Sequence, residues 1–174
     1  RWDRGMIWAA TVRMWGLPVR GLDRVVDGRG AMQWKLLGLL PLVNASGVDI
    51  TRSAVGRMAA ETVWCPTMLL RDNVQWTADG PSRARAQFTK WGETVEPTFT
   101  VNDDGRLQHV ELMRWGDPDE DFQYAPFGGV VEDAGTFGGI TIPTRLRVGW
   151  HIGTDRFEAD GCFFRGVIDD AAFR

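Results

Sequence analysis

Three side chains near the end of one helical segment could do chemistry together. Glu61 opens the stretch ETVWCPTMLL, four residues after Arg57 and three before Trp64. Residues at these spacings share one side of a helix, so a carboxylate, a guanidinium and an indole are presented together. The carboxylate could form a structural ion pair with Arg57, Arg114 or Arg147. Alternatively, it could bind a ligand or act as a general acid or base.

The second candidate for acid–base chemistry is His109, because histidine titrates near neutral pH. His151 is the only other histidine, and Cys65 and Cys162 form no CxxC pair. A structural zinc site takes about four closely spaced ligands, so the sequence predicts no metal site. The two cysteines are expected to be free thiols of a cytoplasmic protein, whereas a disulfide would indicate an oxidising compartment.

Tryptophan is unusually frequent, with nine in the chain. Indoles on strands pack the core of a sheet, because each buries a large apolar area. Several of them could instead line a cavity for an apolar ligand such as a lipid acyl chain, with Glu61, Arg114 and His109 as polar anchors. The residues predicted to bind such a ligand are Trp34, Arg57, Glu61, Trp64, Arg114 and Trp150.

The elements that must position these residues are mostly strands. Apolar and polar residues alternate in MIWAATVRMWG, residues 6–16, and the turn dipeptide Asp27-Gly28 predicts a hairpin. Further short alternating runs with Gly and Asp turns follow in the second half, and an acid-rich loop is predicted over 116–129. The pattern predicts a mainly β protein whose curved antiparallel sheet forms a half-barrel or an open barrel.

One run, SAVGRMAAETVW, has convincing helical periodicity and predicts a helix over about 52–64. Asp49 or Thr51 could cap its start, and Pro66 cannot continue a helix. We expect this helix to pack on the concave face of the sheet. It would then carry the carboxylate and the indole described above toward the sheet.

Length and charge narrow the class of protein. The chain has 174 residues and a formal net charge of −3, so we expect a single domain over 1–174 and no binding to nucleic acid. No apolar run reaches the ~20 residues that cross a bilayer, and no signal-peptide pattern is present. Because the chain opens in a strand-like pattern without Met, we expect a preceding segment to be missing. We expect no cofactor and a cytoplasmic location, and the sequence does not determine the oligomeric state.

Two motifs carry a resemblance to a known family. They are D-G-x-G-x-M at 27–32 and R-x-x-x-E-x-x-W-x-P at 57–66, and DGRLQHVELMRW, PFGG and IPTRLRVGW fit the same pattern further on. With them, the chain resembles a bacterial family of domains of unknown function that is common in actinobacteria. The architecture that this resemblance implies is similar to the half-barrels of bacterial lipoprotein carriers, in which a helix plugs a concave sheet. It implies no catalytic residues.

Three functions therefore stay open. The first is binding of a hydrophobic small molecule or lipid in a Trp-lined cavity beneath the helix. The second is an enzyme that uses the same cavity, with Glu61 or His109 as acid or base. The third is a protein-interaction domain that contacts a partner through a sheet edge or an acidic loop. The acids of that loop are Asp117, Asp119, Glu120 and Asp121.

Overall fold

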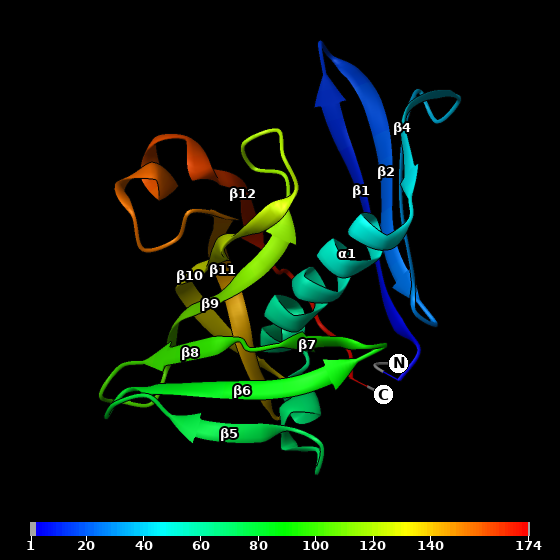
Figure 1. Ribbon diagram of the computed structural model, residues 1–174. Helices are drawn as coiled ribbons and strands as arrows, with labels where there is room; N and C mark the ends of the chain where they lie inside the picture. The colour runs from blue at the N-terminus through cyan, green and yellow to red at the C-terminus, as the bar shows by residue number, and fades with distance from the viewer. Residues whose placement is uncertain (1–2, 174) are drawn as a thin grey trace.

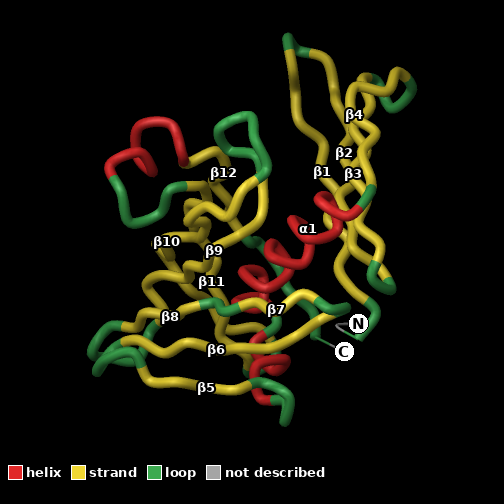
Figure 2. The backbone as a smooth tube through the Cα atoms, viewed as in Figure 1, coloured by secondary structure: helices red, strands yellow, loops and turns green. Residues whose placement is uncertain are grey.

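The computed structural model describes residues 3–173 and consists mainly of antiparallel strands (Figure 1). The prediction of a mainly β protein with one main helix and no closed barrel is confirmed. The strands do not form one sheet, however. They divide between a four-stranded sheet and an eight-stranded sheet, and the helix lies between the two. Figure 2 shows the red helix flanked by the two yellow sheets.

The first sheet is a simple meander in the order β1-β2-β3-β4. Its strands are β1 (Gly5–Met14), β2 (Leu17–Val26), β3 (Arg29–Leu36) and β4 (Leu40–Ser46). Asp27 and Gly28 join β2 to β3 with φ angles of 48° and 77°, the positive values of a type I′ hairpin turn. The predicted hairpin is thereby confirmed.

The second sheet has the order β12-β11-β10-β9-β8-β6-β5, with β7 paired to β6. Its strands are β5 (Gln75–Ala78), β6 (Arg83–Lys90), β7 (Glu93–Val95), β8 (Thr98–Val101), β9 (Leu107–Gly116), β10 (Gln123–Phe137), β11 (Ile140–Trp150) and β12 (Cys162–Val167). A single π-helical turn, η3 (Phe157–Gly161), precedes β12. The acid-rich loop is shorter than predicted, because β10 begins at Gln123.

The helix α1 (Val48–Ala60) begins four residues before the predicted start. It continues into two 3₁₀ turns, η1 (Glu61–Trp64) and η2 (Pro66–Leu70). The predicted caps are wrong, since the N-cap residue is Gly47 and no side chain caps it. Thr51 instead accepts a hydrogen bond from the backbone N–H of Gly30, which ties the helix to β3.

The main hydrophobic core lies around α1, which contacts β9 and β3 most closely. Val55, Met58 and Ala59 of the helix are fully buried there. The approach of α1 to β3 depends on Gly30 in the D-G-x-G-x-M motif. A Cβ atom at Gly30 would lie 2.5 Å from the Cα of Thr51, so any larger residue would push the helix away.

Candidate functional site

The predicted chemical residues on α1 form an ion-pair network with the first sheet. Arg57 donates from Nη1 to the Oδ2 atom of Asp23 on β2 and from Nε to the Oε1 atom of Glu61, both at 2.8 Å. About one-fifth or less of each of these three side chains is exposed. A guanidinium shared by two carboxylates joins the end of the helix to the sheet.

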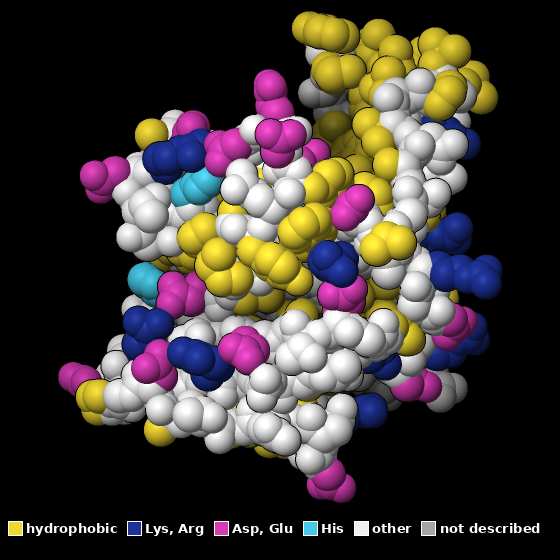
Figure 3. All heavy atoms as spheres, in the orientation of Figure 1, with side chains coloured by type: hydrophobic (Ala, Val, Ile, Leu, Met, Phe, Trp, Pro, Cys, Tyr) yellow, Lys and Arg dark blue, Asp and Glu magenta, His cyan; other side chains and the backbone are white. Residues whose placement is uncertain are grey.

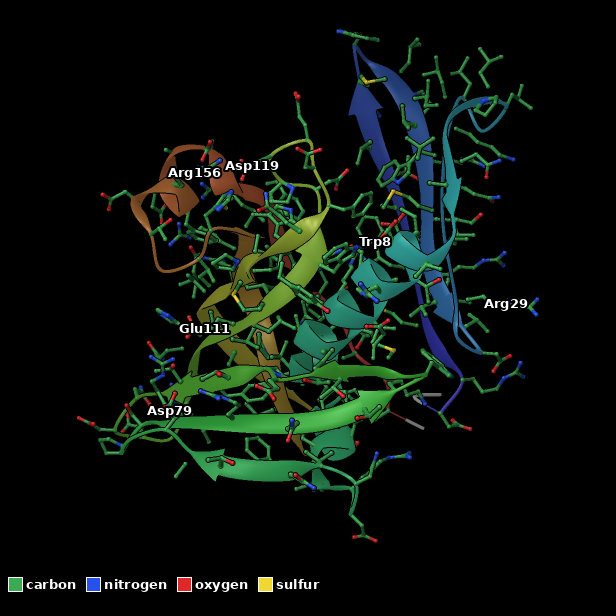
Figure 4. The ribbon with its side chains drawn as sticks, in the orientation of Figure 1. Trp8, Arg29, Asp79, Glu111, Asp119 and Arg156 are labelled. Carbon is green, nitrogen blue, oxygen red and sulfur yellow. The ribbon has the colours of Figure 1, made fainter. Side chains whose placement is uncertain are left out.

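Two indoles from the first sheet cover this network. The Trp34 Nε1–H donates to the Oδ1 atom of Asp23 at 3.2 Å, and the Trp8 ring centroid lies 4.5 Å from the Arg57 guanidinium carbon. The Trp8 and Trp34 centroids are 6.0 Å apart. Figure 4 shows Trp8 between β1 and the helix. Gly21 makes room for Trp34, because a Cβ atom there would lie 2.6 Å from the indole ring.

A second arginine, Arg114 on β9, reaches α1 from the second sheet at Ser53, one helical turn before Arg57. It is buried, and it donates to the backbone oxygen and to the Oγ atom of Ser53, both at 3.1 Å. Its guanidinium carbon lies 4.4 Å from the Phe127 ring centroid and 4.8 Å from that of Trp150. Burial lowers the pKa of Arg114 to about 9, so the side chain stays charged at neutral pH. It anchors the helix to the second sheet.

The electrostatics of Glu61 are set by burial. Burial raises the pKa of the Glu61 carboxyl, and the neighbouring Arg57 partly opposes this rise. A raised carboxyl pKa is found in catalytic acids, but structural ion-pair networks produce it as well. The hydrogen bonds of Glu61 and Arg57 match the structural alternative, because they connect the helix to β2.

A cavity, which we call the η-cavity, lies apart from these residues, between the 3₁₀ turns and the second sheet. Its volume is about 560 Å³ and it is open at one side. Its walls come from η1, η2, β8, the turn after β8, β9, β10 and β11. The lining residues are Val63, Pro66, Leu69, Phe99, Gly105, Arg106, Leu107, Val131, Ala134, Thr136, Thr141, Ile142 and Pro143.

The comparison with known proteins identifies the chain by family. A model of a family of unknown function, DUF6544, matches residues 2–160. The chain belongs to this family. The resemblance to an uncharacterised family is therefore confirmed, and the match includes both motifs at 27–32 and 57–66. No curated protein and no solved structure matches the chain.

In this member of DUF6544, five predicted residues gather around α1. Trp34, Arg57 and Glu61 lie on its first-sheet side, and Arg114 and Trp150 lie on its second-sheet side. Trp64 instead donates from Nε1 to the backbone oxygen of Pro143 at 3.1 Å, which fastens η1 to β11. None of the six residues lines the η-cavity, and its lining contains no tryptophan, so it is not the Trp-lined cavity that the sequence predicts.

His109 does not share a site with Glu61. It is exposed on β9 and alternates with Val110 and Leu112, which face the core. Glu111 shares the outward face of β9 with His109 and pairs with Arg83 at 2.7 Å (Figure 4). His109 therefore faces away from the core side of the second sheet, where α1 packs, and the structure does not combine it with Glu61.

The acidic loop is tied to the segment before β12 through Asp119, which pairs with Arg156. Arg156 donates to Asp119 at 2.8 Å and to Asp160 at 3.4 Å (Figure 4). The hydrogen bond from Arg156 lowers the pKa of Asp119. The negative charge of Asp119, one of the acids expected to contact a partner, is thus neutralised by Arg156 of the same chain.

Other sequence predictions concern metals and membranes. Within residues 3–173, no group of three or more His, Cys, Asp or Glu side chains could hold a metal ion, and Cys65 and Cys162 are free. None of the helices described is both long and apolar enough to cross a bilayer.

Sequence reasoning missed Asp23, which is central to the ion-pair network. A signal was present, because Asp23 shares the inward face of β2 with the buried residues Val19 and Val25. A carboxylate on an apolar strand face needs a buried cationic partner, and Arg57 supplies it. The lining of the η-cavity gave no such signal, since its residues come from seven separate segments.

Proposed function

We propose that the protein binds a small apolar molecule in the η-cavity. The observation that carries this proposal is the size and lining of the cavity. Its volume of about 560 Å³ falls within the ~300–1,000 Å³ range of small-molecule sites. Most of its lining is apolar, and Val63, Leu69 and Phe99 of the wall are buried. The enzyme alternative has no such supporting observation, because Glu61 and His109 do not line this cavity.

The polar residues of the lining suggest the form of the ligand. Arg106, Thr136 and Thr141 are exposed, so they lie toward solvent, while the buried apolar residues of the wall lie deeper. Among the described residues, Arg106 makes no ion pair, which leaves its guanidinium available to an anion. An amphipathic molecule with an apolar chain and a carboxylate, such as a fatty acid, fits this arrangement.

The cavity walls are held apart by packed elements. Trp64 fastens η1 to β11 through Pro143, and Met68 of η2 is buried in the main core. These contacts fix the position of the 3₁₀ turns relative to the second sheet. An apolar cavity that stays open loses dispersion contacts along its lining, and a bound apolar chain would restore them.

The test is binding of a fluorescent fatty acid to the protein and to two tryptophan variants. Ala134→Trp places an indole at the η-cavity, whereas Ala78→Trp places one on exposed β5, outside its lining. We expect the first variant to bind at least tenfold more weakly and the second to bind like the wild type. Equal binding by both variants, or no saturable binding by the wild type, would contradict the proposal.

Arg106→Gln provides a second test on the chemistry of the ligand. If the guanidinium meets the carboxylate, this variant weakens binding of the fatty acid but not of the matching fatty alcohol. The residue is exposed, so the change is not expected to affect folding. An equal effect on acid and alcohol would contradict the assignment of Arg106 to the ligand carboxylate.

A further inference from the structure

The free end of the first sheet carries an exposed apolar surface, which we call the tip surface. It consists of the β1–β2 turn and the β3–β4 turn, and both extend past the N-terminal end of α1 (Figure 1). Trp15 is 88% exposed and Leu39 is 79% exposed. Figure 3 shows a continuous hydrophobic area over these turns. Its other exposed members are Val12, Leu17, Leu37, Leu40, Leu42 and Val43.

The turns themselves use unusual residues at this end of the sheet. Trp15 and Gly16 have φ angles of 51° and 80°, and Leu37 and Gly38 have 56° and 74°. These are the values that Asp27 and Gly28 adopt at the opposite end. Asp or Asn normally takes the first of these positions, since bulky residues are strained at positive φ. Placing Trp and Leu there costs stability, and it exposes their side chains at the apex.

A row of positive charge lies directly behind the apex. Arg13, Arg20 and Lys35 face outward from β1, β2 and β3, and Arg20 is the direct cross-strand partner of Lys35. Like charges in that position destabilise a sheet. None of the three forms an ion pair with another described residue, and residues 9–22 and 33–44 contain no carboxylate. The chain as a whole is negative, with a formal net charge of −3.

A hollow on the β3–β4 hairpin combines both features. Its volume is about 260 Å³, and it places the Lys35 side chain beside Leu39 and Val43. Gln33 and Asn44, which also line the hollow, add hydrogen-bonding groups. A cationic and polar hollow next to an apolar apex matches the headgroup of an anionic lipid above its acyl chains.

From these observations we propose that the tip surface docks onto a bilayer that contains anionic lipid. The basic residues lie two to four residues from the turns, which is about 7–13 Å at ~3.3 Å per strand residue. Amphipathic helices that lie on a membrane bury their apolar face about 5–10 Å deep, at the boundary between headgroups and acyl chains. The apex would therefore enter the acyl boundary while the basic row stays among the headgroups. Tryptophan is favoured at that boundary.

A second copy of the chain is the less suitable occupant. In a two-fold dimer the same patch meets itself, so the basic rows of the two copies would approach each other. That repulsion disfavours self-association, whereas the same positive charge attracts an anionic surface. The proposal rests on residues outside the η-cavity, so its outcome is independent of the proposed function.

The test is flotation with vesicles of equal parts phosphatidylcholine and phosphatidylglycerol, compared with phosphatidylcholine alone. Leu39→Ser is the variant, and Leu70→Ser is its matched control, since Leu70 on η2 is 83% exposed but far from the turns. Burying a leucine is worth at least about 1.5 kcal/mol, so we expect Leu39→Ser to weaken vesicle binding about tenfold. Leu70→Ser should bind like the wild type. Because both leucines are exposed, neither change should prevent folding.

The charge is tested by Lys35→Gln, which should weaken binding to the anionic vesicles about fivefold. The proposal is overturned if the wild type does not float with the anionic vesicles, or if Leu39→Ser and Leu70→Ser bind alike. It is also overturned if phosphatidylcholine alone binds as well as the mixture. The oligomeric state is measured by analytical ultracentrifugation. A wild-type dimer that Leu39→Ser dissociates would also overturn the proposal, because it would assign the tip surface to a second copy of the chain.

Discussion

Replacing Arg57 by methionine tests whether the ion-pair network holds the fold together. The methionine keeps most of the apolar stem but removes both 2.8 Å hydrogen bonds, and it leaves Asp23 and Glu61 without their hydrogen-bonded cation. We assign about 1.5 kcal/mol to each lost bond, the lower end for charged partners, because water reaches part of each carboxylate. The free energy of unfolding should therefore fall by about 3 kcal/mol. The contact with Trp8 adds about 0.5–1 kcal/mol to this loss.

The assay is urea unfolding at pH 7, in which an m-value of about 2 kcal/mol/M converts this loss into a midpoint lower by about 1.5 M. Arg52→Met is the matched control, since Arg52 is on the same helix, pairs with Glu93 and lies 5.0 Å from the Trp115 ring centroid. That pair is more exposed, so its loss should be much smaller. Equal losses from the two variants would refute the reasoning that burial gives Arg57 its importance.

Three further predictions follow from single residues. Gly30→Ala should lower the free energy of unfolding by about 1–3 kcal/mol, measured by urea unfolding, because its Cβ atom would meet Thr51 at 2.5 Å. Glu61→Gln should be more stable than the wild type above the raised pKa of Glu61, because burial disfavours the charged form there. That difference should shrink as the pH falls toward the ordinary value of 4.5, and a difference that grows on acidification would contradict it. His109→Ala should leave fatty-acid binding unchanged by fluorescence titration, since His109 lies outside the η-cavity.

Local features of the sequence were enough for much of the secondary structure. Alternation predicted β1, and Asp27-Gly28 predicted the hairpin turn between β2 and β3, because both signals depend only on neighbouring residues. The helix body was predicted by its period, but its start at Val48 was not. Gly47 gives no side-chain capping signal, and the Thr51 hydroxyl bonds to β3 instead of to the helix N–H groups.

The grouping of the strands depended on the tertiary structure. β6 pairs with β8 as well as with β7, and two separate sheets form where one was expected. Pairing between distant strands is decided by which combination buries the most apolar surface. Alternation within each strand does not specify its partners.

For the candidate site, the sequence determined which residues of α1 share a side, since helical spacing places Arg57 and Glu61 together. Only the tertiary structure decided that Asp23 completes the network and that His109 faces away from it. It also decided that no tryptophan lines the η-cavity. The reason is physical: a cavity is the volume that several distant segments leave between them, so its size depends on how all of them pack.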